Sequence, residues 1–303
     1  MTALERRFAL PGPLDLRLTL APLRHGTFDP TIGIGPDGVW RATRTAEGPA
    51  TVHLSVAGEG VRARAWGPGA ALALDAAPAT VGADDDPAGF EPDHPVVAAL
   101  ARRLAGLRIP RTGAVLEALV PTVLEQKVTG IEAKRSYRAL VRALGERAPG
   151  PGADAGLLVP PSPARLAATP SYAFHRFGVE RRRAETIRRA AAVATRLEEC
   201  TAVGPEAARH RLCAIPGIGP WSAAEVALVA LGDADAVPSG DFHLPHLVAW
   251  NLAGEPRADD ARMLELLEPF AGHRGRVVRL LVAAGTTAPR YGPRAPVRSI
   301  AGL

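Results

Sequence analysis

The sequence predicts an α+β protein in which a small antiparallel α/β domain precedes an all-α bundle. Two observations support this prediction. Apolar and polar residues alternate through residues 39–66, as in half-buried strands, whereas apolar residues after residue 95 recur every three to four positions, as in amphipathic helices. A polar stretch rich in Asp, Gly and Pro, residues 84–92, separates the two patterns. We therefore expect a sheet domain over residues 1–88 and a helical domain over residues 89–303.

In the first domain, strands are expected at 39–45, 50–57 and 61–66, with a turn at 58–60 and a short helix within 68–80. The alternation predicts an antiparallel sheet with one face exposed to water. Residues 148–163 contain five prolines and three glycines and are expected to form a surface loop. The helices of the second domain are expected at 95–105, 112–126, 130–147, 162–169, 180–198, 205–214, 220–231, 243–253, 258–269 and 273–285.

The composition restricts the class of protein. The chain has 303 residues, of which 47% are hydrophobic, enough for two packed domains. No stretch reaches the roughly 20 apolar residues that cross a bilayer, and no export signal is apparent, so we expect no membrane association. The two cysteines, Cys200 and Cys213, are too few for a four-cysteine metal centre. A reducing cytoplasm is the expected location.

Charge is distributed unevenly along the chain. Residues 1–95 carry a net charge of −4 and residues 96–303 carry +9. The second domain is therefore expected to bind a polyanion. Only two of the 36 basic residues are lysines, Lys127 and Lys134, so a mechanism that needs a lysine amine has two candidates.

One segment has the pattern of a helical hairpin: Ile215-Pro-Gly-Ile-Gly-Pro-Trp221, followed by Ser222. Gly217 and Gly219 allow a tight turn in which backbone amides can approach another chain closely, and the N-terminus of the next helix suits a phosphate. Taken alone, two such glycines more often serve helix packing.

A second motif, Val237-Pro-Ser-Gly-Asp-Phe-His243, places Asp241 22 residues after Gly219. With this spacing the sequence resembles the helix-hairpin-helix DNA glycosylases, from about residue 107 to residue 284. The resemblance includes Leu124-Glu-Gln-Lys-Val-Thr129, similar to the segment that these enzymes insert into the minor groove, and a helix start after Gly178. The order of sheet before bundle is similar to that of the inducible bacterial 3-methyladenine DNA glycosylases.

The resemblance implies a monofunctional glycosylase of base excision repair that hydrolyses the N-glycosidic bond of damaged bases, in particular alkylated purines. Asp241 is then the catalytic carboxylate, which stabilises the oxocarbenium-like cation at the sugar. A helix N-cap is the alternative interpretation of Asp241. Trp221 stands where lyase-competent relatives carry a lysine, so water is the expected nucleophile; an ordinary core indole is the alternative.

The expected substrate pocket consists of Trp221, Glu225, Phe242 and Tyr172. Glu225 follows Trp221 by one helical turn and replaces the aromatic residue that the resemblance leads us to expect, and Ala284 stands near an expected tryptophan. Glu225 either accepts a hydrogen bond from a base or lies on a solvated face. Tyr172 belongs to an aromatic cluster before Gly178, for which packing is the main alternative.

The residues expected to contact DNA lie in three segments, and a solvated helix terminus is the alternative for the first of them. They are Gln126, Lys127 and Thr129; Gly217, Ile218, Gly219 and Ser222; and His243. The run Arg181-Arg182-Arg183 begins a helix, where cations are less costly if phosphates lie nearby; a solvated face is the alternative. His243 and His246 lack a further ligand for zinc, so no metal site is expected.

The expected partner is double-stranded DNA that contains damaged bases, bound by a monomer associated with the nucleoid. No cofactor is required, although the resemblance allows a monovalent cation at the hairpin. Two alternatives stay open: a non-catalytic binder of distorted DNA, and a glycosylase for a deaminated base.

Overall fold

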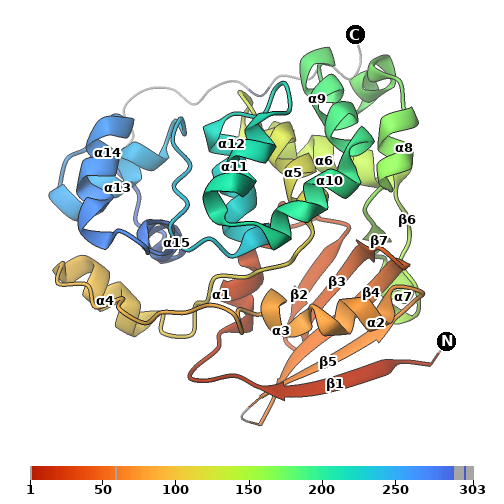
Figure 1. Ribbon diagram of the computed structural model, residues 1–303, viewed down its shortest axis with the longest axis horizontal. Helices are drawn as coiled ribbons and strands as arrows, with labels where there is room; N and C mark the ends of the chain where they lie inside the picture. The colour runs from red at the N-terminus through yellow and green to blue at the C-terminus, as the bar shows by residue number, and fades with distance from the viewer. Residues whose placement is uncertain (1, 59, 290–296, 298–303) are drawn as a thin grey trace.

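A computed structural model describes residues 2–58, 60–289 and 297 (Figure 1). Its N-terminal part is a five-stranded antiparallel sheet of order β1-β5-β4-β3-β2, and the rest is largely helical, which confirms the predicted fold class. The strands are β1 (Leu4–Ala9), β2 (Ile32–Gly35), β3 (Gly38–Thr45), β4 (Gly48–Ala57) and β5 (Gly60–Trp66).

The sequence pattern located β3, β4 and β5 but not β1 and β2. β1 is exposed along nearly its whole length, so it has no apolar alternation, and β2 has only four residues. One face of the sheet is covered by three short helices: α1 (Leu16–Leu20), α2 (Ala70–Asp75) and α3 (Ala77–Thr80). Leu20, Leu54, Val61 and Leu74 belong to the core between them.

The prediction of a surface loop at 148–163 is wrong. The segment contains α7 (Pro151–Asp154) and β7 (Leu158–Val159), and β7 pairs with β6 (Glu146–Arg147). Its prolines and glycines form tight turns, and the segment packs on the second face of the sheet, where Thr51 Oγ1 donates to the carbonyl of Pro149 at 2.7 Å. Thr51 and His53 of β4 are consequently buried, so this face is not the wet face that the alternation predicted.

The helical part has two cores (Figure 1). The central core is built by α5 (Val115–Glu125), α6 (Gly130–Leu144), α9 (Arg181–Ala192), α11 (Pro205–Cys213) and α12 (Pro220–Val226). The C-terminal core joins α13 (Leu244–Ala253), α14 (Asp260–Leu267) and α15 (Arg274–Ala284) to α4 (Pro95–Arg103), which comes from the segment after the sheet. The remaining helices are α8 (Pro163–Ala168), α10 (Ala194–Glu198) and the short turns η1 (Ala21–Leu23), η2 (Ser171–Phe177), η3 (Glu199–Ala202), η4 (Ala227–Leu231) and η5 (Glu268–Phe270).

The helices lie close to the predicted positions, with three differences. The helix expected at 130–147 ends at Leu144, and Glu146–Arg147 form β6 instead. The helix expected at 180–198 is interrupted at Val193, where α9 ends and α10 begins. The helix expected at 220–231 changes after Val226 into a π-turn, η4, which ends at Gly232. Such turns insert a residue into the helical ladder and redirect the chain.

The acidic segment between sheet and bundle is anchored rather than fully solvated. Asp85 forms a buried ion pair with Arg276 of α15, at 2.6 Å, and also accepts from the backbone amide of Ile109. The sheet contacts the central core through Glu117 of α5, whose carboxylate accepts from Arg41 and Thr43.

Candidate active site

The helical hairpin consists of α11, a turn over residues 214–219 and α12. Buried Ile215 and Ile218 anchor the turn in the central core. Gly217 has φ +101° and lies against α9, where an added Cβ would overlap the hydroxyl of Thr186. Gly219 has an extended backbone, and nothing within 4 Å would meet a Cβ there. Within the described residues, the amides of Gly217 and Gly219 donate no hydrogen bond, so both are free for an external acceptor.

Asp241 lies in the loop between η4 and α13, and three donors fix its carboxylate. Oδ1 accepts from the backbone amides of His243 at 2.7 Å and Leu244 at 2.8 Å, and Oδ2 accepts from Trp221 Nε1 at 3.2 Å. Through the amide of Leu244, the first residue of α13, Asp241 is tied to the start of that helix, but the N-cap position is His243 and not Asp241, as the alternative interpretation would require. The indole contact also joins it to α12, so the two sequence motifs meet in space.

Glu225 lies on α12 one turn after Trp221 and is largely buried. Burial, together with the nearby carboxylates of Glu125 and Asp241, raises the pKa of Glu225 to about 7. Arg279 of α15 acts in the opposite direction on that pKa. The carboxyl of Glu225 is therefore harder to ionise than that of an exposed glutamate.

Arg279 was not identified from the sequence. Burial lowers the pKa of its guanidinium to about 10, an effect that Glu225 partly offsets. Its Nη2 donates to the carbonyl of Leu18 at 3.4 Å, and its Nε is buried without a partner among the described residues. The sequence offered one sign that Arg279 is buried. It lies between the apolar residues Val278 and Leu280, in a helix that the sequence predicted.

The segment between α5 and α6 is tied to the hairpin. Gln126 Nε2 donates to the carbonyl of Gly217 and to Ser222 Oγ, both at 2.9 Å. Thr129 forms a capping box with Glu132 at the start of α6. Between them, exposed Lys127 has φ +55°, and it is the one non-glycine residue with positive φ in the described part of the chain.

Neither nearby phosphate nor a solvated face, the two interpretations of the Arg181-Arg182-Arg183 run, describes Arg183. Its side chain is buried, and Nη1 donates to the carbonyl of Leu124 at 2.7 Å, near the end of α5. The helix start therefore points one cation inward to satisfy a C-terminal carbonyl of another helix. Arg181 and Arg182 are exposed.

Phe242 and Tyr172, both predicted for the pocket, have exposed rings (80% and 81%). Phe242 packs edge-on against His243, with ring centres 4.9 Å apart, so it lies beside Asp241. Tyr172 lies on η2, which packs on α6 and α9, and within the described residues no hydrogen bond or ring contact joins it to Asp241. The structure thus brings Phe242, but not Tyr172, next to the predicted carboxylate.

No group of three or more His, Cys, Asp or Glu side chains in the described ranges is arranged to hold a metal ion. His246 instead accepts the amide hydrogen of Ala258. At the hairpin, the carbonyls of Ile215 and Gly217 already accept hydrogen bonds from Ile218 and Gln126. The monovalent cation stays a prediction.

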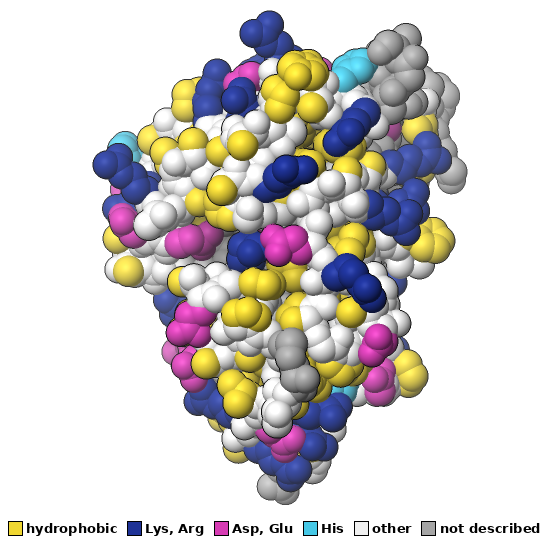
Figure 2. Space-filling model, turned by 90° about the vertical axis from the view of Figure 1, so that its right-hand side faces the viewer, with side chains coloured by type: hydrophobic (Ala, Val, Ile, Leu, Met, Phe, Trp, Pro, Cys, Tyr) yellow, Lys and Arg dark blue, Asp and Glu magenta, His cyan; other side chains and the backbone are white. Residues whose placement is uncertain are grey.

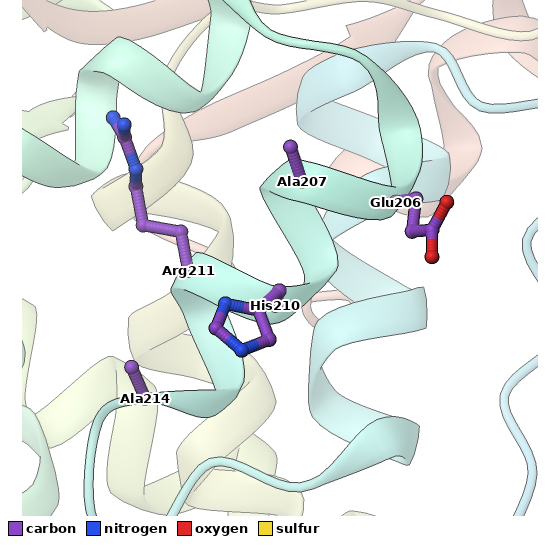
Figure 3. A pocket seen from close by; sticks show the side chains of 5 residues that line it. All are labelled: Glu206, Ala207, His210, Arg211 and Ala214. Atoms are coloured by element: carbon purple, nitrogen blue, oxygen red, sulfur yellow. The ribbon is translucent and has the colours of Figure 1, made fainter.

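The surface views in Figures 2 and 3 show a face of mixed charge and a hollow outside the predicted site. Figure 2 shows a face on which Lys and Arg side chains are interspersed with hydrophobic and acidic ones. The hollow in Figure 3 lies along α11 and is lined by Glu206, Ala207, His210, Arg211 and Ala214. None of the predicted site residues lines it, so it is not the candidate active site.

No helix among the described residues is both long and apolar enough to cross a membrane.

Comparisons with known proteins agree with this architecture. No protein-family model matches the chain. A stretch of 181 residues, 57% of this chain, is 34% identical to the probable bifunctional transcriptional activator/DNA repair enzyme AlkA of Mycobacterium tuberculosis. The chain spans only about a third, 33%, of the length of that relative.

Solved structures show the same fold over most of the chain. The 3-methyladenine DNA glycosylase of Archaeoglobus fulgidus has a TM-score of 0.75 at 17% identity, over 91% of this chain and 97% of its own. An 8-oxoguanine glycosylase/lyase of Clostridium acetobutylicum, solved with double-stranded DNA, has a TM-score of 0.69 at 14% identity, over 90% of this chain and 92% of its own.

The chain thus has the fold of these DNA glycosylase structures, and a stretch of 181 residues is similar in sequence to AlkA, in agreement with the resemblance seen in the hairpin and aspartate motifs.

Proposed function

We propose that the protein is a monofunctional DNA glycosylase that removes alkylated purines by hydrolysis. The main support is the Asp241 carboxylate, which is held by two backbone amides and the Trp221 indole beside a hairpin with free amides. A carboxylate fixed in this way needs little reorganisation when positive charge develops next to it.

The proposed reaction breaks the bond between C1′ of the sugar and the base nitrogen. The bonding electrons leave with the base, and the sugar acquires oxocarbenium character that the Asp241 carboxylate stabilises. A water molecule then bonds to C1′ and loses a proton. A purine that already carries a positive charge departs as a neutral base, so the reaction needs no general acid.

Water as nucleophile is supported by the residue at position 221. Trp221 has no amine, and its indole nitrogen is directed to Asp241. Of the two lysines, Lys127 is exposed at the tip of the 126–129 segment, and Lys134 lies along α6, where its side chain contacts Gly26. Neither lies at the Trp221 position, which is the position that the resemblance assigns to a Schiff-base lysine.

DNA binding is proposed to use main-chain groups of the hairpin. The free amides of Gly217 and Gly219 suit a phosphate and position the protein without reading sequence. Gln126 links the same turn to the segment that carries Lys127. That segment is proposed to fill the space left when the damaged nucleotide rotates out of the duplex.

The test uses duplexes that each carry one defined lesion: N7-methylguanine, hypoxanthine or 8-oxoguanine. After incubation and removal of the protein, an abasic-site endonuclease reveals abasic sites, because hot alkali would attack N7-methylguanine itself. We expect cleavage at N7-methylguanine only after the endonuclease treatment, and no covalent adduct with borohydride. Cleavage at hypoxanthine alone would support the deaminated-base alternative, and a trapped adduct would exclude a monofunctional enzyme. Binding without abasic sites from any duplex would support the non-catalytic binder.

A further inference from the structure

The turn between η1 and β2, residues 24–28, exposes an aromatic ring. The ring of Phe28 is 70% exposed, although the turn that carries it is held by hydrogen bonds. The buried carboxylate of Asp29 accepts from the backbone amides of His25 and Thr31, at 2.6 and 2.8 Å. The ring is therefore presented outward by a fixed turn, which needs little ordering when a partner binds.

This turn packs against α6 and the end of α5. His25 Nδ1 lies 3.8 Å from the carboxylate of Glu125, the last residue of α5. The side chain of Lys134, on α6, lies against the turn, and the guanidinium carbon of Arg138 lies 5.6 Å from the centre of the Phe28 ring. The turn therefore lies next to the segment assigned to the minor groove, which begins one residue after Glu125.

The exposed side of α6 is basic, and we call it the basic face. Its members recur every three or four residues, so they lie on the same side of the helix. They are Ile131, Lys134, Arg135, Arg138 and Arg142. None of the four cations has a hydrogen bond or ion pair within the described ranges, whereas arginines of α11 and α14 are paired with glutamates at 2.8 and 2.7 Å. Because like charges at this spacing destabilise a helix, the arrangement favours an anionic partner.

We infer that the 24–28 turn and the basic face form a second DNA-binding surface, in which the cations contact phosphates beyond the damaged base pair and Phe28 packs against a deoxyribose. The inference rests on the proposed function and brings the sheet domain into DNA binding. Duplex DNA is the expected partner because the basic face begins beside the segment assigned to the minor groove. From there it extends about 16 Å along α6, the length of about five base pairs. Cations bind phosphates without reading sequence, and covering the ring removes apolar surface from water.

The first test removes two cations of the basic face. Arg135→Gln together with Arg138→Gln should weaken binding of an undamaged duplex, measured by fluorescence anisotropy at several salt concentrations. Each phosphate contact contributes about 0.9 to the slope of log affinity against log salt, so the slope should become shallower by about 1.8. Arg102→Gln together with Arg103→Gln, at the exposed end of α4, is the matched control. It removes the same charge from another helix and should keep the wild-type slope.

The second test concerns the ring in the turn. Phe28→Ala removes no charge, so the salt slope should equal that of the wild type while the affinity for undamaged duplex falls several-fold. The thermal unfolding temperature should not fall, because the ring is exposed, whereas a purely structural role would lower it. Val56→Ala, which shortens another exposed apolar side chain (58%) on β4, is the control and should bind duplex as the wild type does.

The outcomes that contradict the inference are distinct from failure of the proposed function. If the double variant at Arg135 and Arg138 keeps the wild-type slope and affinity, the inference is overturned and the basic face is left to a partner other than DNA. Unchanged affinity in Phe28→Ala, or an equal loss in Val56→Ala, would also overturn it. If the wild type binds duplex but releases no base from any lesion duplex, the proposed function fails, which is a separate result.

Discussion

Lys127 has a left-handed backbone conformation, which costs a residue with a Cβ about 1–2 kcal/mol. The surrounding contacts enforce it. Gln126 is bonded to the hairpin on one side, and the Thr129 capping box fixes the other. Strain of this kind concentrates at functional positions, and here it projects an exposed side chain from the segment assigned to the minor groove.

Replacement of Lys127 by glycine should therefore have opposite effects on stability and function. Lys127→Gly should raise the free energy of unfolding by about 1 kcal/mol, because glycine adopts positive φ without strain. It should also lower base release from a lesion duplex, because the inserted side chain is lost. Urea unfolding and single-turnover kinetics measure the two effects. Lower stability together with unchanged base release would contradict this account of the segment.

At the residue scale, the sequence predicted Asp241 and Trp221 from the spacing of two motifs, and the structure joins them by a hydrogen bond. It predicted Glu225 from its position one turn after Trp221. Arg279 could not be found in this way, because it comes from α15, more than 50 residues from Glu225, and its meaning depends on how two helical cores meet. Tyr172 is the opposite case, a residue that was predicted for the pocket but does not lie beside Asp241. The sequence showed the aromatic cluster, but it did not show where that cluster lies in the fold.

At the element scale, the hairpin gives its two glycines different roles. Gly217 has a positive φ and lies against Thr186, so its role is conformational and steric. Gly219 has an ordinary backbone with open space where a Cβ would be, so nothing in the fold requires glycine there. Close approach of an external chain would explain it.

The two alanine variants should therefore differ: one should lower stability and the other should weaken DNA binding. Gly217→Ala should lower the free energy of unfolding by about 2 kcal/mol or more, because of positive φ and the overlap with Thr186. Gly219→Ala should fold as the wild type does but bind undamaged duplex several-fold more weakly. Thermal unfolding and fluorescence anisotropy measure these effects. If Gly219→Ala binds plain duplex as tightly as the wild type, the hairpin has only a structural role.

Element positions in the helical part followed from periodicity, because most helices have one face in a core. The break at Val193 and the π-turn after Val226 could not be predicted, since neither leaves a local signature. The prediction of a surface loop at residues 148–163 was wrong for another reason. Their prolines and glycines are typical of loops, but buried Ala148, Leu157 and Val159 pack against the sheet, and only the tertiary structure supplies that contact.

At the scale of the whole molecule, the site depends on how the C-terminal core is held beside the central one. Trp221 belongs to the central core and Asp241 leads into α13 of the other, so a shift between them would disturb their hydrogen bond. The Asp85–Arg276 pair secures the C-terminal core to the segment after the sheet, and both side chains are about 95% buried.

Asp85→Asn should consequently destabilise the protein by about 3–5 kcal/mol, because a buried guanidinium loses its counter-charge. Arg6, paired with Asp75 on the surface, provides a control: Asp75→Asn should change stability by less than about 1 kcal/mol. Chemical denaturation of both variants measures the difference. Similar small losses for the two would show that the Asp85 pair does not hold the cores together.

The most direct test of the account is the rate of base release by Asp241→Asn. Asparagine can keep Oδ1 as acceptor for the amides of His243 and Leu244, so the contacts with the start of α13 survive, while the negative charge and the hydrogen bond from Trp221 Nε1 are lost. Asp259→Asn, at the N-cap of α14, makes the same change away from the site. On a duplex with N7-methylguanine, we expect Asp241→Asn to release base at least about 100-fold more slowly than the wild type, with unchanged duplex affinity, and Asp259→Asn to match the wild type. Base release by Asp241→Asn within about threefold of the wild-type rate would contradict the catalytic role of this carboxylate.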